Sequence, residues 1–151
     1  MRTLKLPKLS YSPWVPWEER NKISGAKFPG IYLIAISNKD LSGLSPSYRD
    51  VVYIGMTNSK QGLKGRWQQF FNSIRGKNGH SGGNTVYRHL GHYDNWSKKL
   101  FVSAMPIECN TETPDQRDLI KMGWVAFLEY EAFFEFYSEM PKQKKPEFNT
   151  K

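Results

Sequence analysis

The chain has 151 residues, which suits one domain around a single hydrophobic core. Its 22 Lys and Arg outnumber 14 Asp and Glu, and the net charge of +8 favours a polyanionic partner. No apolar run approaches the roughly 18 residues of a membrane span, and the first residues lack the apolar segment of a secretory signal. A lone cysteine, Cys109, excludes an intramolecular disulfide and suits a reducing compartment, so we expect a buried thiol in a soluble cytoplasmic protein.

Residues 1–28 form an extension that precedes the first predicted strand. Pro16 suits a first helical position and predicts a short helix over about 17–23. Trp14 and Trp17 allow two interpretations: an apolar clip that packs the extension on the domain, or rings that stack on nucleotide bases. We favour the clip.

Two short apolar runs rich in β-branched residues follow, at 30–36 and 51–56. A turn-prone stretch over 37–50, with glycine and proline, separates them and predicts a β-hairpin. Because side chains alternate along a strand, the register decides whether Tyr53 lies beside Tyr32. With the suitable register, two phenols lie close together at one end of a small sheet.

The next predicted element is a helix over about 61–76. Its apolar residues recur with the spacing of one buried stripe. They are Leu63, Trp67, Phe70, Phe71 and Ile74. Arg66 falls at the edge of this stripe, where its head can extend into water or reach the end of the sheet that carries the tyrosines. We favour the second position, which sets a cation beside two phenols.

The stretch 75–84 is glycine-rich and basic, and we expect a loop that approaches a phosphate backbone. A short helix over 85–90, ended by Gly91, should follow. His80 lies in the loop, where an imidazole suits a phosphate contact or a proton-transfer role. A zinc site made by the three histidines is disfavoured, because no cysteine lies nearby.

The run 100–107 predicts the third strand, and a long helix follows it. Thr113 suits the N-cap, Pro114 the first helical position and Gln116 the end of a capping box. These signals predict a helix from 114 to about 138.

This last helix carries a carboxylate within an apolar face. At about 100° per residue, Glu129 falls on the apolar side, whereas Glu131 and Glu135 point away from it. The apolar residues are Met122, Val125, Ala126, Ala132, Phe133 and Phe136. Burying a carboxylate costs on the order of several kcal/mol unless a cation or hydrogen bonds compensate it. The alternative is a helix buried along Phe127 and Phe134, which would leave Glu129 exposed.

Five features stand in one order between residues 30 and 149. They are Gly30-Ile31-Tyr32, Tyr53-Ile54-Gly55, Arg66, Glu129 and Asn149. In this order they resemble the GIY-YIG nuclease family, as a stand-alone domain of the bacterial or phage type. The resemblance implies a small α/β domain of the α+β type over 29–151, with a three-stranded antiparallel sheet flanked by helices. It also implies an endonuclease that hydrolyses phosphodiester bonds in DNA with Mg²⁺ or Mn²⁺.

The resemblance assigns roles to these residues. Glu129 would hold the metal ion, which keeps most of its waters and takes further ligands from the phosphate. Arg66 would donate to the non-bridging oxygens. Tyr32 would be the base for the attacking water, and Tyr53 would orient that water or the phosphate. The supporting residues are Gly30, Gly55 and Asn149, the last by holding the chain end against the site.

The chain departs from the family pattern one turn after the arginine. Many members carry a histidine or tyrosine there, whereas Phe70 cannot carry a proton. Either His80, Lys60 or Lys64 substitutes, or the site is weakened. The rival hypothesis is therefore a catalytically weak or inactive basic nucleic-acid-binding module of the same fold.

Exposed cations should contact the phosphate backbone of the partner. The candidates are Lys60, Arg75, Lys77, Arg88 and Lys144. Since 151 residues leave no room for a separate recognition domain, specificity would come from loops, from self-association as a homodimer, or from a partner. DNA is the expected substrate, and RNA stays open.

Overall fold

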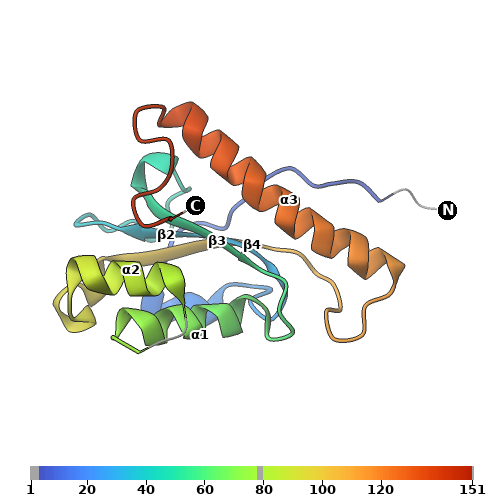
Figure 1. Ribbon diagram of the computed structural model, residues 1–151, viewed down its shortest axis with the longest axis horizontal. Helices are drawn as coiled ribbons and strands as arrows, with labels where there is room; N and C mark the ends of the chain where they lie inside the picture. Colours follow the sequence, from blue (N-terminus) through green and yellow to red (C-terminus); the bar gives the residue numbers. More distant parts are fainter. Residues whose placement is uncertain (1–3, 78–79, 151) are drawn as a thin grey trace.

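The computed structural model describes residues 4–77 and 80–150, which form a mixed α+β domain (Figure 1). The strands are β1 (Val15–Pro16), β2 (Gly30–Ile36), β3 (Val51–Thr57) and β4 (Leu100–Pro106). The helices are α1 (Gly62–Ile74), α2 (Ser81–Leu90) and α3 (Gln116–Glu139). Short 3₁₀ turns add η1 (Trp17–Lys22), η2 (Tyr48–Asp50), η3 (Tyr93–Asn95) and η4 (Ser97–Lys99). Within the described ranges, no helix has both the length and the apolar character that crossing a membrane requires.

The predicted hairpin of β2 and β3 is confirmed, and its register brings the tyrosines together. Tyr32 pairs with Gly55 and Ile34 pairs with Tyr53. The two tyrosines are therefore diagonal neighbours on one face of the sheet, within reach of aromatic side chains. The register shifts by one residue between Ile34 and Ala35, beyond the tyrosine pair.

The expectation of three strands is wrong by one, because the N-terminal extension adds a fourth. All neighbours are antiparallel, in the order β1-β4-β2-β3, and Val15 pairs with Val102. Trp14 and Trp17 flank β1 and are each 1% exposed. They enter the hydrophobic clusters on opposite faces of the sheet, which fixes the short strand between them. Neither ring is accessible for stacking on a base.

Helices cover both faces of the sheet (Figure 1). On one face, α1 buries its predicted stripe together with α2, and on the other face lies α3. In α3, Val125, Leu128 and Phe136 are fully buried, whereas Phe127 is 51% and Phe134 69% exposed. The alternative in which α3 buries Phe127 and Phe134 is therefore excluded.

Two helix starts differ from the sequence expectation. The N-cap of α3 is Asp115 and not Thr113, because the Asp115 side chain accepts from the N–H of Asp118 and the Asp118 carboxylate accepts in return from the N–H of Asp115. This reciprocal capping box is stronger than the one expected from Thr113. The expected loop over 75–84 is wrong at its end, because α2 already begins at Ser81, and residues 78–79 of this stretch lie outside the described residues.

Candidate functional site

The phenols of Tyr32 and Tyr53 lie next to each other between the sheet and the layer of α1 and α2. Their ring centroids are 6.1 Å apart, with an angle of 38° between the planes. Tyr32 is fully buried, and Tyr53 is 8% exposed. Gly55 makes this packing possible, because a Cβ there would lie 2.8 Å from Cε1 of Tyr32.

His80 is the polar partner of Tyr32. Its Nε2 lies 2.8 Å from the Tyr32 hydroxyl, and its Nδ1 accepts from the N–H of Gly83 at 3.1 Å. Because Nδ1 is used as an acceptor, a neutral imidazole carries its proton on Nε2 and donates it to the tyrosine oxygen. The same side chain thus caps α2 and orients the phenol.

Burial keeps this imidazole neutral. Burial, and to a smaller extent the positive charge of Arg66, lower the pKa of His80 to about 3. His80 is therefore a hydrogen-bond donor to Tyr32 at neutral pH. The proton-transfer role expected for His80 becomes, in this arrangement, a means of stabilising negative charge on the Tyr32 oxygen.

Arg66 supplies the cation of the site from α1. It is half-buried, and its Nη1 donates to Gln69 at 2.8 Å. Burial raises the pKa of Tyr32 and of Tyr53, whereas the Arg66 guanidinium lowers both. Arg66 thus favours the phenolate forms that burial opposes.

Glu129 reaches the same region from α3, around the outer edge of β3. Its side chain is 9% exposed, and its negative charge raises the pKa of both tyrosines. Together with Tyr53 and Asn149 it lines a hollow of about 40 Å³. A volume of this size holds water or a single cation and is too small to enclose a phosphodiester.

The oxygen donors of this hollow fit Mg²⁺ or Mn²⁺. One buried carboxylate and a phenol are hard ligands, and magnesium keeps most of its waters. Over the described ranges, no three His, Cys, Asp or Glu side chains cluster to form an all-protein metal cage. Any cation here would therefore depend on Glu129, water and substrate oxygens.

Asn149 holds the chain end against β3. Its Oδ1 accepts from the N–H of Ile54 and its Nδ2 donates to the carbonyl of Ile54, both at 2.9 Å. The N–H of Phe148 also donates to the carbonyl of Val52 at 2.9 Å. These bonds satisfy the outer edge of β3 and place the tail at one wall of the hollow.

Gly82 is a site residue that sequence reasoning missed. A Cβ at this position would lie 2.6 Å from Cζ of Tyr53 and 3.0 Å from Cε1 of His80. The absence of a side chain therefore lets the start of α2 approach the tyrosine. The pattern His80-Ser81-Gly82-Gly83 is the signal, because a side chain that can cap a helix stands before two glycines that allow close approach.

The expected phosphate-contacting cations are exposed but do not converge on the tyrosines. Lys60 precedes α1 and Arg75 follows it, so they lie roughly 20 Å apart along the helix. Lys64 and Lys77 are exposed at the two ends of the same helix, Arg88 lies on α2, and Lys144 lies beside α3.

A charge pattern that the sequence analysis overlooked unites most of these cations. Residues 51–93, which include α1 and α2, contain no Asp or Glu. They contain six Lys and Arg: Lys60, Lys64, Arg66, Arg75, Lys77 and Arg88. The helices α1 and α2 thus carry cations and no carboxylate, as expected of a surface that meets a polyanion, while η1, which packs against α1, adds Glu18 and Glu19.

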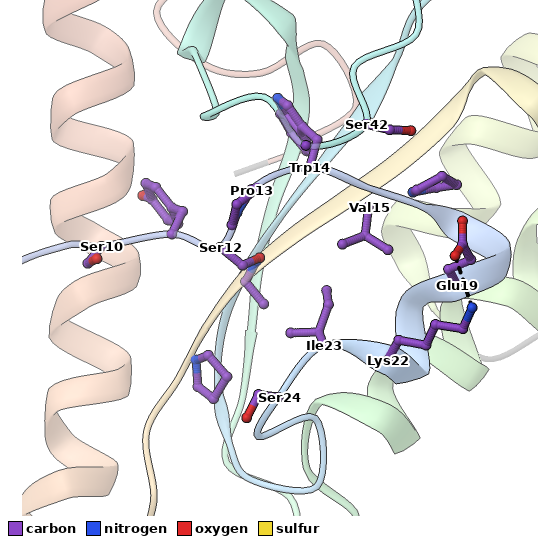
Figure 2. Close-up of a pocket in the computed structure, with 15 residues that line it drawn as sticks. Ser10, Ser12, Pro13, Trp14, Val15, Glu19, Lys22, Ile23, Ser24 and Ser42 are labelled. Atoms are coloured by element: carbon purple, nitrogen blue, oxygen red, sulfur yellow. Dashed lines mark hydrogen bonds and ion pairs between the residues drawn. The ribbon is translucent and has the colours of Figure 1, made fainter.

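A much larger hollow, of about 690 Å³, lies at the opposite edge of the sheet, beside β1. Its walls come mainly from the segment 10–24, which includes Val15 and Ile23, with Ser42 from the loop after β2 and Ala104 and Pro106 from β4 (Figure 2). Its charged residues, Glu19 and Lys22, form an ion pair of 3.0 Å with each other. None of the sequence-predicted site residues lines it.

Comparison of the chain with protein-family models, with curated proteins and with solved structures finds no match.

Proposed function

We propose that this protein is a divalent-metal-dependent endonuclease of the GIY-YIG type that hydrolyses phosphodiester bonds in DNA. One observation carries the proposal: five elements (β2, β3, α1, α2 and α3) bring two phenols, an imidazole, a guanidinium and a buried carboxylate together near one edge of the sheet. The phenols and the imidazole are linked by the 2.8 Å contact of Tyr32 and His80. The cationic layer of α1 and α2 supports a nucleic-acid substrate.

In the proposed mechanism, the residues of the chain bind the phosphate and hold protons. Arg66 donates to the non-bridging oxygens while negative charge develops on the phosphorus centre. One phenol of the pair, in its ionised form, takes the proton of the attacking water, and the N–H of His80 stabilises the phenolate at Tyr32. A cation held by Glu129 supplies Lewis-acid polarisation of the phosphate when bound.

The two phenols differ in their access to solvent and substrate. Tyr53 lines the hollow that contains Glu129, whereas Tyr32 lies behind it with no exposed surface. Tyr53 is therefore the phenol that first meets water or phosphate. Because burial raises the pKa of both phenols, we expect cleavage to speed up about tenfold per pH unit through the neutral and mildly alkaline range.

The experiment is conversion of supercoiled plasmid to nicked or linear forms with Mg²⁺ or Mn²⁺. Glu129→Ala and Arg66→Ala should each abolish cleavage. Glu139→Ala and Arg117→Ala remove an exposed carboxylate and an exposed guanidinium from α3 and serve as the matched controls. Cleavage that survives Glu129→Ala would contradict the proposal.

The alternative is a basic nucleic-acid-binding module of the same fold that has little or no activity. The small volume of the hollow and the absence of a protic group at Phe70 favour it. Salt-sensitive DNA binding without cleavage, across metals and pH, is the outcome that supports this alternative.

A further inference from the structure

The outer face of α3 carries an apolar seam that nothing in the described chain covers. Its residues follow the spacing three, four, three, four, three, which is the a/d pattern of a coiled coil. The seam residues are Ile120, Gly123, Phe127, Tyr130, Phe134 and Tyr137. The five with side chains are between 50% and 73% exposed, and α3 is the outermost element on its side of the sheet (Figure 1).

This seam is distinct from the buried face of α3. Val125, Leu128 and Ala132, which pack on the sheet, belong to other positions of the same helix. A helix that is apolar on both sides needs a second partner for the free side. We propose that the partner is a second copy of this chain, and that two α3 helices pack antiparallel along their seams.

The seam is self-complementary in the antiparallel direction. A two-fold axis between residues 128 and 129 sets every a position opposite a d position of the second copy. The facing pairs are Phe127 with Tyr130, Gly123 with Phe134, and Ile120 with Tyr137. The pairing of Gly123 with Phe134 matches the smallest residue of the seam to a protruding ring, since a Cβ at Gly123 would meet nothing within 4 Å.

The charges near the two ends of α3 also favour antiparallel pairing of the two helices. Lys144 and Lys145 line a hollow of about 620 Å³ beside the C-terminal end of the seam, together with Tyr130 and Tyr137. Residues 112–118, at the start of α3, hold three carboxylates and one cation, Arg117. Antiparallel pairing brings this segment of the second copy towards these lysines and also opposes the two helix dipoles. Parallel pairing would set lysine against lysine and Phe134 against Phe134.

The exposed aromatic area supplies a large share of such an interface. Four aromatic side chains that are 50% to 73% exposed offer roughly 500 Å². That is more than half of the ~800 Å² that each partner contributes to a standard interface, before Leu119 and Ile120 are counted.

Sedimentation of the full chain over a range of micromolar concentrations tests the dimer. We expect a concentration-dependent rise from one to two chain masses, and Phe134→Asp should weaken association about 100-fold. Leu44→Asp, which charges an exposed leucine outside α3, should leave association unchanged. Because Phe134 is 69% exposed, its variant keeps the far-UV circular dichroism of the native chain.

Disulfide trapping tests the direction of the helices. In a Cys109→Ser background, a chain with Ile120→Cys is mixed with a chain with Tyr137→Cys and oxidised. Mixed disulfides are the expected product, whereas like-with-like disulfides would overturn antiparallel pairing. A chain that stays monomeric overturns the proposal, and if Phe134→Asp then weakens DNA binding, the seam is a platform for stacked bases. None of these readouts depends on nuclease activity.

Discussion

At the scale of single residues, His80 is a neutral hydrogen-bond donor to Tyr32, at a position where the sequence pattern suggests a proton carrier. His80 is 2% exposed and has a hydrogen bond at each ring nitrogen, to Gly83 and to Tyr32. Protonation would break the bond from Gly83, since both nitrogens of an imidazolium are donors. The structure therefore couples the protonation state of one side chain to the start of α2 and to the tyrosine pair.

This coupling predicts a loss of stability in acid. A histidine of the unfolded chain titrates near pH 6.5, whereas burial and the charge of Arg66 lower the pKa of His80 to about 3 in the folded chain. Between these values the unfolded chain binds a proton that the folded chain does not, so the free energy of unfolding falls as the pH falls. His80 alone should account for about 2 kcal/mol between pH 7 and pH 5, measured by urea unfolding.

The variant His80→Gln isolates this contribution. Glutamine keeps an N–H donor for Tyr32 but does not titrate, so the difference between the two pH values should shrink by about 2 kcal/mol. His92→Gln, at an exposed histidine, is the control and should leave the difference unchanged. An undiminished difference in His80→Gln would show that other groups set the acid sensitivity.

Gly55 gives a second prediction at this scale. Gly55→Ala inserts a methyl group into the space of the Tyr32 ring and should lower the free energy of unfolding by about 1–3 kcal/mol, as overpacking does. The same substitution in a Tyr32→Ala background should cost much less, because the ring is gone. Thermal or urea unfolding of the four proteins gives this coupling directly, and additive effects would argue against the contact.

At the scale of elements, apolar periodicity predicted which helix faces are buried, whereas local hydrogen bonds determine where α3 begins. The buried stripe of α1 and the inward position of Glu129 follow from spacing alone, since a helix keeps one angular step throughout. The start of α3 does not, because Thr113 and Asp115 are both good N-caps and only the reciprocal bonds with Asp118 select Asp115. A two-residue strand such as β1 leaves no period to detect.

The choice of cap is open to a direct test. Asp115→Ala should destabilise the chain by about 1 kcal/mol, because it leaves the N–H of Asp118 without its capping acceptor. Thr113→Ala removes the cap that the sequence favoured and should change stability by well under half of that, since the Thr113 hydroxyl accepts its hydrogen bond from the exposed Asn110 side chain and caps no helical N–H. Equal losses in the two variants would contradict the observed cap.

At the scale of the whole molecule, charge is distributed unevenly between the helices on the two sides of the sheet. The helices α1 and α2 carry cations and no carboxylate, whereas the C-terminal half of α3 carries four glutamates. Sequence reasoning found the net charge but not this distribution, which becomes visible only when the fold places α1 and α2 together on one face of the sheet. The same holds for the site: its residue types could be predicted in order, but their convergence around the edge of β3 depends on long-range pairing.

This distribution of charge predicts where DNA binds. Arg75→Gln with Lys77→Gln should reduce the slope of log affinity against log salt by about 1.8, if each cation contacts one phosphate. Lys5→Gln with Lys8→Gln, on the N-terminal segment beside α3, should leave the slope unchanged. The measurement is a fluorescence-anisotropy titration at several salt concentrations, and equal effects of the two pairs would count against a one-sided interface.

The bonds of Asn149 and Phe148 to β3 have a practical consequence for handling the protein. Proteolytic removal of the last few residues would expose unpaired backbone groups on β3, the edge strand. These groups could then form hydrogen bonds with a strand of a neighbouring molecule. Such preparations should turn turbid on storage, and affinity tags are better fused to the other terminus.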